Sequence, residues 1–215
     1  MNTPSQQWKY GAFVLVFWLL SAPIGGWFDI FTAPGELPIF LGVFLALPIL
    51  FFTTLYFAGT PFRAFANSIS LSLTVGAHLW RYVGFGFVIA FLLGKLPAEF
   101  AIPEGLGDIV AAIFALPLAL ALHRKKPVRG YFIAWNIFGL IDLISAITMG
   151  ILYSEGSFGI LRTDASTALM TTFPVNVIPT FFVPLFILLH VLALLRRNEV
   201  ATTLNSGVRF AKGIS

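Results

Sequence analysis

Two ionisable side chains three residues apart, His78 and Arg81, lie near the middle of the apolar run from Leu73 to Leu93. This run is long enough to cross a bilayer. A charged side chain at the centre of a membrane-spanning helix costs roughly 2.5 to 3.5 kcal/mol on insertion scales, so it is retained where it has a partner, a water-filled cavity or a function. The rest of the chain should therefore supply a partner for Arg81.

The best partner for Arg81 is Asp142, in the apolar segment predicted to be helical at 131–153. Depth can be counted along each predicted helix at about 1.5 Å per residue. This count puts His78, Arg81 and Asp142 in the middle third of the bilayer. A stripe of small residues around Gly139 allows the two helices to approach closely. We therefore predict a forked, charge-assisted contact between Arg81 and Asp142.

This contact has two interpretations, and the residues favour them equally. It is either part of a gate, anion anchor or proton-coupled site, or it is a structural ion pair that fixes the register of two helices. Asp108 is predicted toward the outside, within two turns of a helix start, where a pathway role and stabilisation by the helix dipole are both open. Glu104, four residues earlier, is assigned to the dipole alone.

His78 and His190 raise a second chemical hypothesis, because two transmembrane histidines can ligate a haem iron. Against it, the chain has no cysteine and hence no CxxCH attachment motif, and the two histidines are predicted at different depths. The pattern favours hydrogen-bonded histidines between helices. No metal site is predicted and no cofactor is favoured, with haem kept as the alternative.

The composition indicates a polytopic membrane protein. Hydrophobic residues make up 58% of the 215 residues and charged residues 10%, whereas a soluble domain carries about 25% charged residues. The mean hydropathy is +0.92. We predict one all-α transmembrane domain over residues 1–215, a six-helix bundle with a turn at 60–67 and a polar cytoplasmic tail at 196–215. The predicted helices cover residues 11–31, 37–57, 68–94, 103–123, 131–153 and 173–195.

The basic residues predict that both termini are cytoplasmic, because Lys and Arg concentrate in short cytoplasmic segments. Most of the 13 basic residues fall in segments that this orientation places inside. They are Lys9, Arg63, Arg124, Lys125, Lys126, Arg129, Arg196, Arg197, Arg209 and Lys212. The pI of about 9.6 therefore reflects topology and not nucleic-acid binding. We predict a multi-pass protein of the cell membrane that binds no nucleic acid.

Pro48, Pro117 and Pro184 are predicted to kink the second, fourth and sixth helices. An interior proline frees the carbonyl four residues earlier, which for Pro184 is that of Thr180. A freed carbonyl either lines a polar cavity or is satisfied by a neighbouring helix. Pro103 is predicted to be the first residue of the fourth helix, a position that proline favours.

The leading hypothesis is that the protein binds or passes a small solute or ion through a polar centre. The candidate residues are Arg81, Asp142, Asp108, His78 and His190. In this hypothesis Arg81 attracts an anionic group or neutralises Asp142, while Asp108 or His78 exchanges protons. Two alternatives stay open, a membrane-embedded haem or redox protein and a noncatalytic subunit of a membrane complex, and a homo-oligomer or a partner subunit fits the small chain. No Walker loop, GxSxG or HExxH motif occurs, so no catalytic residue is predicted.

Overall fold

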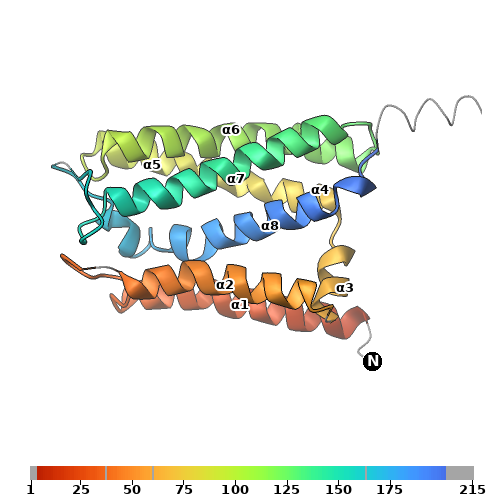
Figure 1. Ribbon diagram of the computed structural model, residues 1–215, viewed down its shortest axis with the longest axis horizontal. Helices are drawn as coiled ribbons and strands as arrows, with labels where there is room; N and C mark the ends of the chain where they lie inside the picture. The colour runs from red at the N-terminus through yellow and green to blue at the C-terminus, as the bar shows by residue number, and fades with distance from the viewer. Residues whose placement is uncertain (1–3, 37, 60, 163, 202–215) are drawn as a thin grey trace, which may run out of the picture.

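The computed structural model describes residues 4–36, 38–59, 61–162 and 164–201. Within these ranges every regular element is a helix, which confirms the predicted all-α class (Figure 1). Five helical spans are long and apolar enough to cross a membrane, and the apolar part of the first helix, Gly11–Trp27, is shorter. The five spans are Ile39–Phe57, Leu71–Leu92, Ala98–His123, Arg129–Leu152 and Ile178–Leu195. Six spans, cytoplasmic termini, a cell-membrane location and a single domain stay predictions, and most of the predicted tail lies outside the described residues.

The long helices form two layers with α8 (Val183–Leu195) between them (Figure 1). One layer holds α1 (Pro4–Trp27) and α2 (Ile39–Phe57), and the short helix α3 (Pro61–Ser68) leads from it to the other. The second layer contains α4 (Leu71–Gly76), α5 (Gly84–Leu92), α6 (Ala98–His123) and α7 (Arg129–Leu152). The remaining short elements are the 3₁₀ helices η1 (Ala77–Val83), η2 (Ala168–Thr171) and η4 (Arg197–Glu199), and the π-helix η3 (Ile178–Phe182).

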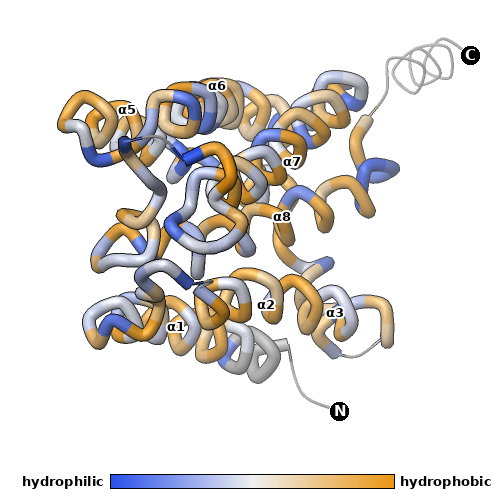
Figure 2. The backbone as a smooth tube through the Cα atoms, turned by 60° about the vertical axis from the view of Figure 1, so that its left-hand side comes forward, coloured by the Kyte–Doolittle hydropathy of each residue, from blue (hydrophilic) through white to orange (hydrophobic). Residues whose placement is uncertain are grey.

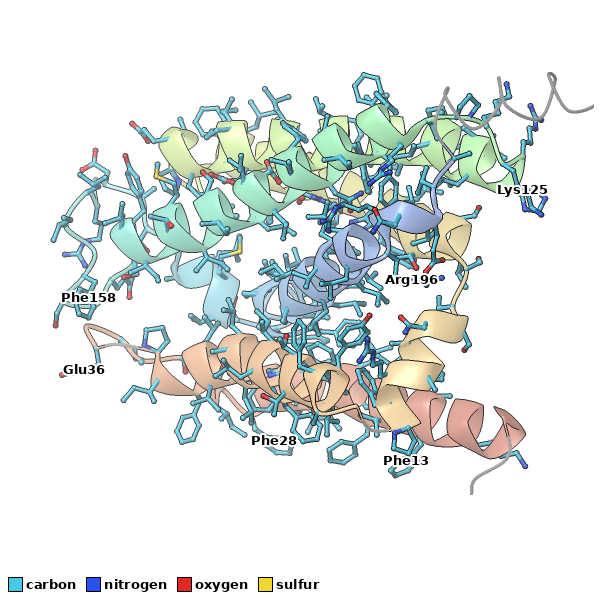
Figure 3. The ribbon with its side chains drawn as sticks, turned by 45° about the vertical axis from the view of Figure 1, so that its right-hand side comes forward. Phe13, Phe28, Glu36, Lys125, Phe158 and Arg196 are labelled. Carbon is cyan, nitrogen blue, oxygen red and sulfur yellow. The ribbon has the colours of Figure 1, made fainter. Side chains whose placement is uncertain are left out.

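Hydrophobic residues cover the lengths of the helices, and hydrophilic residues gather at their ends (Figure 2). Figure 3 shows Lys125 at one end of the molecule and Glu36 and Phe158 at the other, and these ends are called the basic end and the acidic end below. Phe13 and Phe28 point away from the bundle and are 69% and 70% exposed. An outer surface of this kind suits contact with lipid chains, which are as apolar as leucine.

The helix predicted at 68–94 is interrupted, and the predicted turn before it is mostly helical. Pro61 begins α3, at a first helical position where its missing N–H costs nothing. Ser70 then caps α4, because its hydroxyl oxygen accepts a hydrogen bond from the backbone N–H of Leu73 at 3.1 Å. Hydropathy alone misses these breaks, since α3 is amphipathic and α4 continues directly into η1 and α5. Thr60 lies outside the described residues.

The prediction that Pro103 begins the fourth helix is wrong. Helix α6 begins at Ala98, with Pro97 at the N-cap and Glu99 in the first turn, where the helix dipole favours an acidic side chain. Pro103 lies inside α6, as does Pro117, and Pro48 lies inside α2. Whether these prolines bend their helices stays a prediction.

The segment predicted at 173–195 becomes α-helical only at Val183, after the π-helical turn η3. Pro184 therefore lies near the start of α8. The carbonyl of Thr180, which Pro184 leaves free, accepts a hydrogen bond from the indole Nε1 of Trp18 at 3.0 Å. A neighbouring helix thus satisfies this carbonyl, as expected for a proline in a membrane-spanning helix.

Two apolar clusters lie on either side of a buried polar layer along α6. The cluster nearer the acidic end consists of Phe87, Leu96, Phe100, Ala101 and Met170. The cluster nearer the basic end, called the basic-side cluster below, consists of Val75, Ala115, Leu118, Ala119, Phe132, Trp135, Ala193 and Val200. Side chains between two such layers are shielded from water, which strengthens their electrostatic interactions.

Candidate functional site

Arg81 is completely buried and lies in η1, in the middle of the span Leu71–Leu92. A 3₁₀ helix has 3.0 residues per turn, so His78 and Arg81 extend in the same direction from η1. Both side chains enter the centre of the bundle, where His78 is 1% exposed. His78 and Arg81 therefore share one face of η1.

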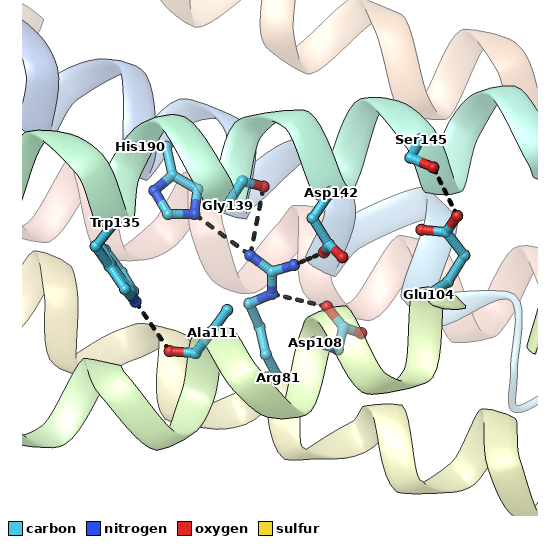
Figure 4. Close-up of polar contacts among 9 residues, drawn as sticks. All are labelled: Arg81, Glu104, Asp108, Ala111, Trp135, Gly139, Asp142, Ser145 and His190. Carbon is cyan, nitrogen blue, oxygen red and sulfur yellow. Dashed lines mark hydrogen bonds and ion pairs between the residues drawn. The ribbon is translucent and has the colours of Figure 1, made fainter. Parts of the chain in front are cut away.

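The guanidinium of Arg81 contacts partners on three helices (Figure 4). Its Nε donates a hydrogen bond to Asp108 Oδ1 of α6 at 2.7 Å, and its Nη2 donates to Asp142 Oδ2 of α7. Its Nη1 lies 3.5 Å from the carbonyl oxygen of Gly139 on α7 and 3.4 Å from Nε2 of His190 on α8. Each of the three guanidinium nitrogens therefore already has a partner within the protein.

The predicted contact between Arg81 and Asp142 is confirmed, but it is not a two-bond fork: only Nη2 reaches Asp142, and Nε binds Asp108 instead. The sequence placed Asp108 nearer the outside because the fourth helix was predicted to begin at Pro103. Helix α6 begins five residues earlier, at Ala98, which at about 1.5 Å per residue puts Asp108 about 7.5 Å deeper than predicted. At this depth Asp108 lies within reach of the long side chain of Arg81.

A third carboxylate, Glu104, is buried one helical turn from Asp108 on α6. It is 2% exposed, and its Oε1 accepts a hydrogen bond from the hydroxyl of Ser145 at 2.8 Å (Figure 4). The assignment of Glu104 to the helix dipole alone is therefore wrong. Its spacing of four residues from Asp108, which puts both acids on one helix face, was the available signal. We call Arg81, Glu104, Asp108 and Asp142 the Arg81 cluster.

The Arg81 cluster has an excess of acidic groups. Within the described part of the chain, the only ion pairs to Asp108 and Asp142 come from Arg81. Three ionised carboxylates and one guanidinium give −3 + 1 = −2. Burying uncompensated charge costs several kcal/mol per ion. The arrangement can therefore accept additional protons or a bound cation, and the guanidinium already binds two carboxylates.

His78 and His190 lie against each other, with ring centroids 4.0 Å apart. Nδ1 of His190 lies 2.9 Å from the side-chain oxygen of Asn136, whereas neither ring nitrogen of His78 has a hydrogen-bond partner among the described residues. A haem ligated by two histidines lies between their rings. Because these rings contact each other directly, the pair does not fit a haem plane. Asn136, fully buried in α7, was missed by the sequence reasoning although it is an amide in an apolar run.

Two glycines allow the helices to approach at the Arg81 cluster. A Cβ atom at Gly107 would overlap the carboxylate of Asp142. One at Gly139 would overlap the ring of His190 and lie 3.1 Å from Nη1 of Arg81. The close packing that brings these charges together therefore requires the absence of a side chain at both positions.

A cavity of about 690 Å³ extends from the acidic end to Asp108. Its outer part is lined by Glu36, Glu155 and Phe158, all of which are exposed, and its walls come from α2, α5, α6, α7, η2, η3 and α8. Asp108 therefore belongs both to the Arg81 cluster and to the cavity wall. On the opposite side, the basic-side cluster packs between α4, α6, α7 and α8.

A family model matches residues 38–196, a range that contains the whole Arg81 cluster and both buried histidines. The chain belongs to this family, which is described as "Domain of unknown function (DUF8737)". That description names no activity. No curated protein and no solved structure matches the chain. The function must therefore be argued from the site itself.

Proposed function

We propose that this membrane protein binds a small solute or ion in the cavity and passes it across the bilayer by way of the Arg81 cluster. The proposal rests on one observation: Asp108 belongs both to the Arg81 cluster and to the wall of the cavity. Its Oδ1 is held by Arg81, while the residue itself lines a cavity that reaches the acidic end. A buried charge kept at the wall of a cavity is typical of substrate and ion pathways in membrane proteins.

Access to the cluster from one side supports the proposal. The cavity reaches Asp108 from the acidic end, and the basic-side cluster closes the other direction. Passage requires that closed side to open while the other side closes. The 3₁₀ segment η1 carries Arg81 and lies between α4 and α5, and a 3₁₀ stretch within a helix often marks a hinge.

The charge balance favours a cation or a proton as the species that moves. Arg81 already binds two carboxylates, so its role in the proposal is to neutralise Asp108 and Asp142, and the anion-anchor version of the hypothesis is not favoured. Asp108 would receive the moving charge at the cavity wall. His78, with two nitrogens that lack hydrogen-bond partners among the described residues, is a candidate for exchanging a proton.

Ion flux into proteoliposomes tests this function. Vesicles that contain the protein and an internal pH dye are given a potassium diffusion potential, and proton, sodium and chloride fluxes are measured. Wild type should conduct protons or sodium above protein-free vesicles. Asp108→Asn should abolish the flux, and Ala146→Trp should block it by filling the cavity that Ala146 lines.

The matched control is Ile144→Trp, a substitution two residues away on α7 at a side chain that is 57% exposed. It places the same indole on the same helix but on the outer surface, so its flux should equal that of wild type. Flux no greater than in protein-free vesicles for all three ions and for an organic cation, or flux that persists in both Asp108→Asn and Ala146→Trp, contradicts the proposal.

A further inference from the structure

We infer that the cavity accepts a hydrophobic organic cation, a protonated amine with an apolar body. The inference deepens the proposed function, on which it rests for its physiological meaning, by naming the substrate class of the same site. The inference rests on one cavity of suitable size, in which the charged lining residues are all acidic and the walls between them are apolar.

All the charged residues that line the cavity are acidic. Glu36 and Glu155 are exposed at its outer part, and Asp108 is 8% exposed at its inner end. The described lining contains no Lys, Arg or His. Acidic walls in a low-dielectric cleft concentrate cations and repel anions. A positive group that reached Asp108 would also offset the acidic excess of the Arg81 cluster.

Between these acids the walls are apolar. They include Leu45, Phe87, Phe100, Leu143, Ile147 and Val183. The rings of Phe87 and Phe100 lie 5.6 Å apart, centroid to centroid, and provide aromatic faces that attract an ammonium group. The volume of about 690 Å³ falls in the range of about 300 to 1,000 Å³ that is usual for small-molecule sites. A ligand that fills this space must be largely apolar.

An unpaired oxygen atom of the wall is suited to an ammonium group. Among the described residues, Asp108 Oδ1 accepts from Arg81 and no hydrogen bond reaches Oδ2. An ammonium group has three donors and no acceptor, so a carboxylate oxygen without a partner suits it. The polar end of the ligand is therefore predicted to reach Asp108.

An inorganic cation fits the cavity less well. Calcium requires six to eight oxygen ligands and magnesium about six. No group of three or more metal-ligating side chains occurs in the part of the chain that the structure describes. The three acids of the cavity wall are separated by apolar side chains, which an organic cation contacts and a metal ion does not.

Three probes with one apolar body and different charge test the inference. Phenylbutylamine is the cation, phenylbutanol is neutral and phenylbutyrate is the anion. Binding is measured by calorimetric titration of the full chain in nanodiscs of phosphatidylcholine, with titrations of empty discs subtracted. The amine should bind at least about tenfold more tightly than the alcohol, and the anion more weakly than both.

Variants locate the binding. Ala146→Trp should abolish binding of the amine and Ile144→Trp should leave it unchanged, because Ala146 lines the cavity and Ile144 does not. Asp108→Asn should weaken the amine at least about tenfold and leave the alcohol unchanged. Because Asp108 also pairs with Arg81, this variant is first compared with wild type by thermal unfolding, and if it does not fold, Ala146→Trp decides.

Equal affinities for the three probes, tightest binding of the anion, or amine binding that survives Ala146→Trp overturns the inference. Titration in nanodiscs requires no transport, so its result is separate from that of the flux assay. Selective amine binding with no flux of protons, sodium or the amine itself contradicts the proposed function and leaves the inference intact. Ion flux together with equal affinities for the three probes supports the proposed function and overturns the inference.

Discussion

The C-terminal segment that includes η3 and α8 contacts two different polar interfaces. Toward α6 and α7, His190 meets the Arg81 cluster, in which the buried groups are charged. Toward α1, the interface is neutral: the Trp18 indole donates to the Thr180 carbonyl, and Asn176 Nδ2 donates to the Ala22 carbonyl at 2.7 Å. Both interfaces lie among apolar side chains, and only one contains ionised residues.

This difference shows that the polar groups of the neutral interface are accounted for by folding alone, whereas the buried charges are not. Neutral side chains are sufficient to satisfy backbone carbonyls, including the one that Pro184 frees, and such hydrogen bonds in membranes contribute on average about 0.6 kcal/mol. Buried charges cost several kcal/mol each before they are paired. The charged interface also has excess acid and borders the large cavity. A second cavity, of about 330 Å³ between α1, α2, α3 and α8, has no charged residue in its described lining.

Replacement of Arg81 should produce the largest effect. Arg81→Ala leaves Asp108 and Asp142 buried without a cation, so we expect a loss of about 3 to 5 kcal/mol in unfolding free energy and a complete loss of flux. Unfolding in mixed detergent micelles measures the first quantity. Arg81→Lys, which keeps the charge but lacks the planar fork, should lie between wild type and alanine. Stability of Arg81→Ala equal to that of wild type would contradict a paired cluster.

Variants of the two carboxylates that bind Arg81 should distinguish a role in a pathway from a structural ion pair. Both contact Arg81, but only Asp108 lines the cavity. Asp108→Asn should therefore reduce flux at least about tenfold more than Asp142→Asn, while the two variants unfold with similar free energies. Equal flux in the two variants would favour the structural role. So would full activity of the charge swap Arg81→Asp with Asp142→Arg, and the chain would then be better described as a noncatalytic subunit.

At the neutral interface a smaller effect is expected. Trp18→Phe keeps an aromatic ring against Phe181, whose centroid lies 4.9 Å away, but removes the donor to Thr180. We expect a loss of about 0.5 to 1.5 kcal/mol in unfolding free energy and no change in flux. The matched control is Trp27→Phe, at a side chain that is 70% exposed, with no expected loss. A flux defect in Trp18→Phe would show that the neutral interface also takes part in function.

The smallest effect is expected outside the spans, at Glu199. Arg196 donates two hydrogen bonds to its carboxylate and a third to the carbonyl of Ile69 at 2.6 Å. The hydrogen bonds from Arg196 lower the pKa of Glu199 below its ordinary value of 4.5. The stability from this pair is therefore present above pH 4.5 and is lost as the pH falls through the lowered pKa.

Because Glu199 is half exposed, solvent screens the pair and its contribution should be less than about 1 kcal/mol. Unfolding of wild type and Glu199→Gln is compared between about pH 7 and about pH 3. The two should differ near neutral pH and converge in acid. A difference that grows as the pH falls would show that the carboxylate does not act through Arg196.

The sequence by itself determined the membrane class, the approximate helical segments and the meeting of Arg81 with Asp142. These follow from local rules: apolar length sets a span, and a charge deep in one span calls for an opposite charge at the same depth in another. The freed carbonyl of Thr180 was likewise predictable, because a proline removes a specific donor.

Only the tertiary structure decided which groups complete the site. The early start of α6 puts Asp108 at the depth of Arg81 and turns Glu104 from an expected helix-end residue into a buried one, and Asn136 meets His190 across two helices. The cavity has walls from seven helical elements, several of them distant in sequence. Periodicity within one helix cannot show such features, because they depend on how far separate helices rise and approach. That approach is set at glycines whose missing side chains matter only when the partner helix is in place.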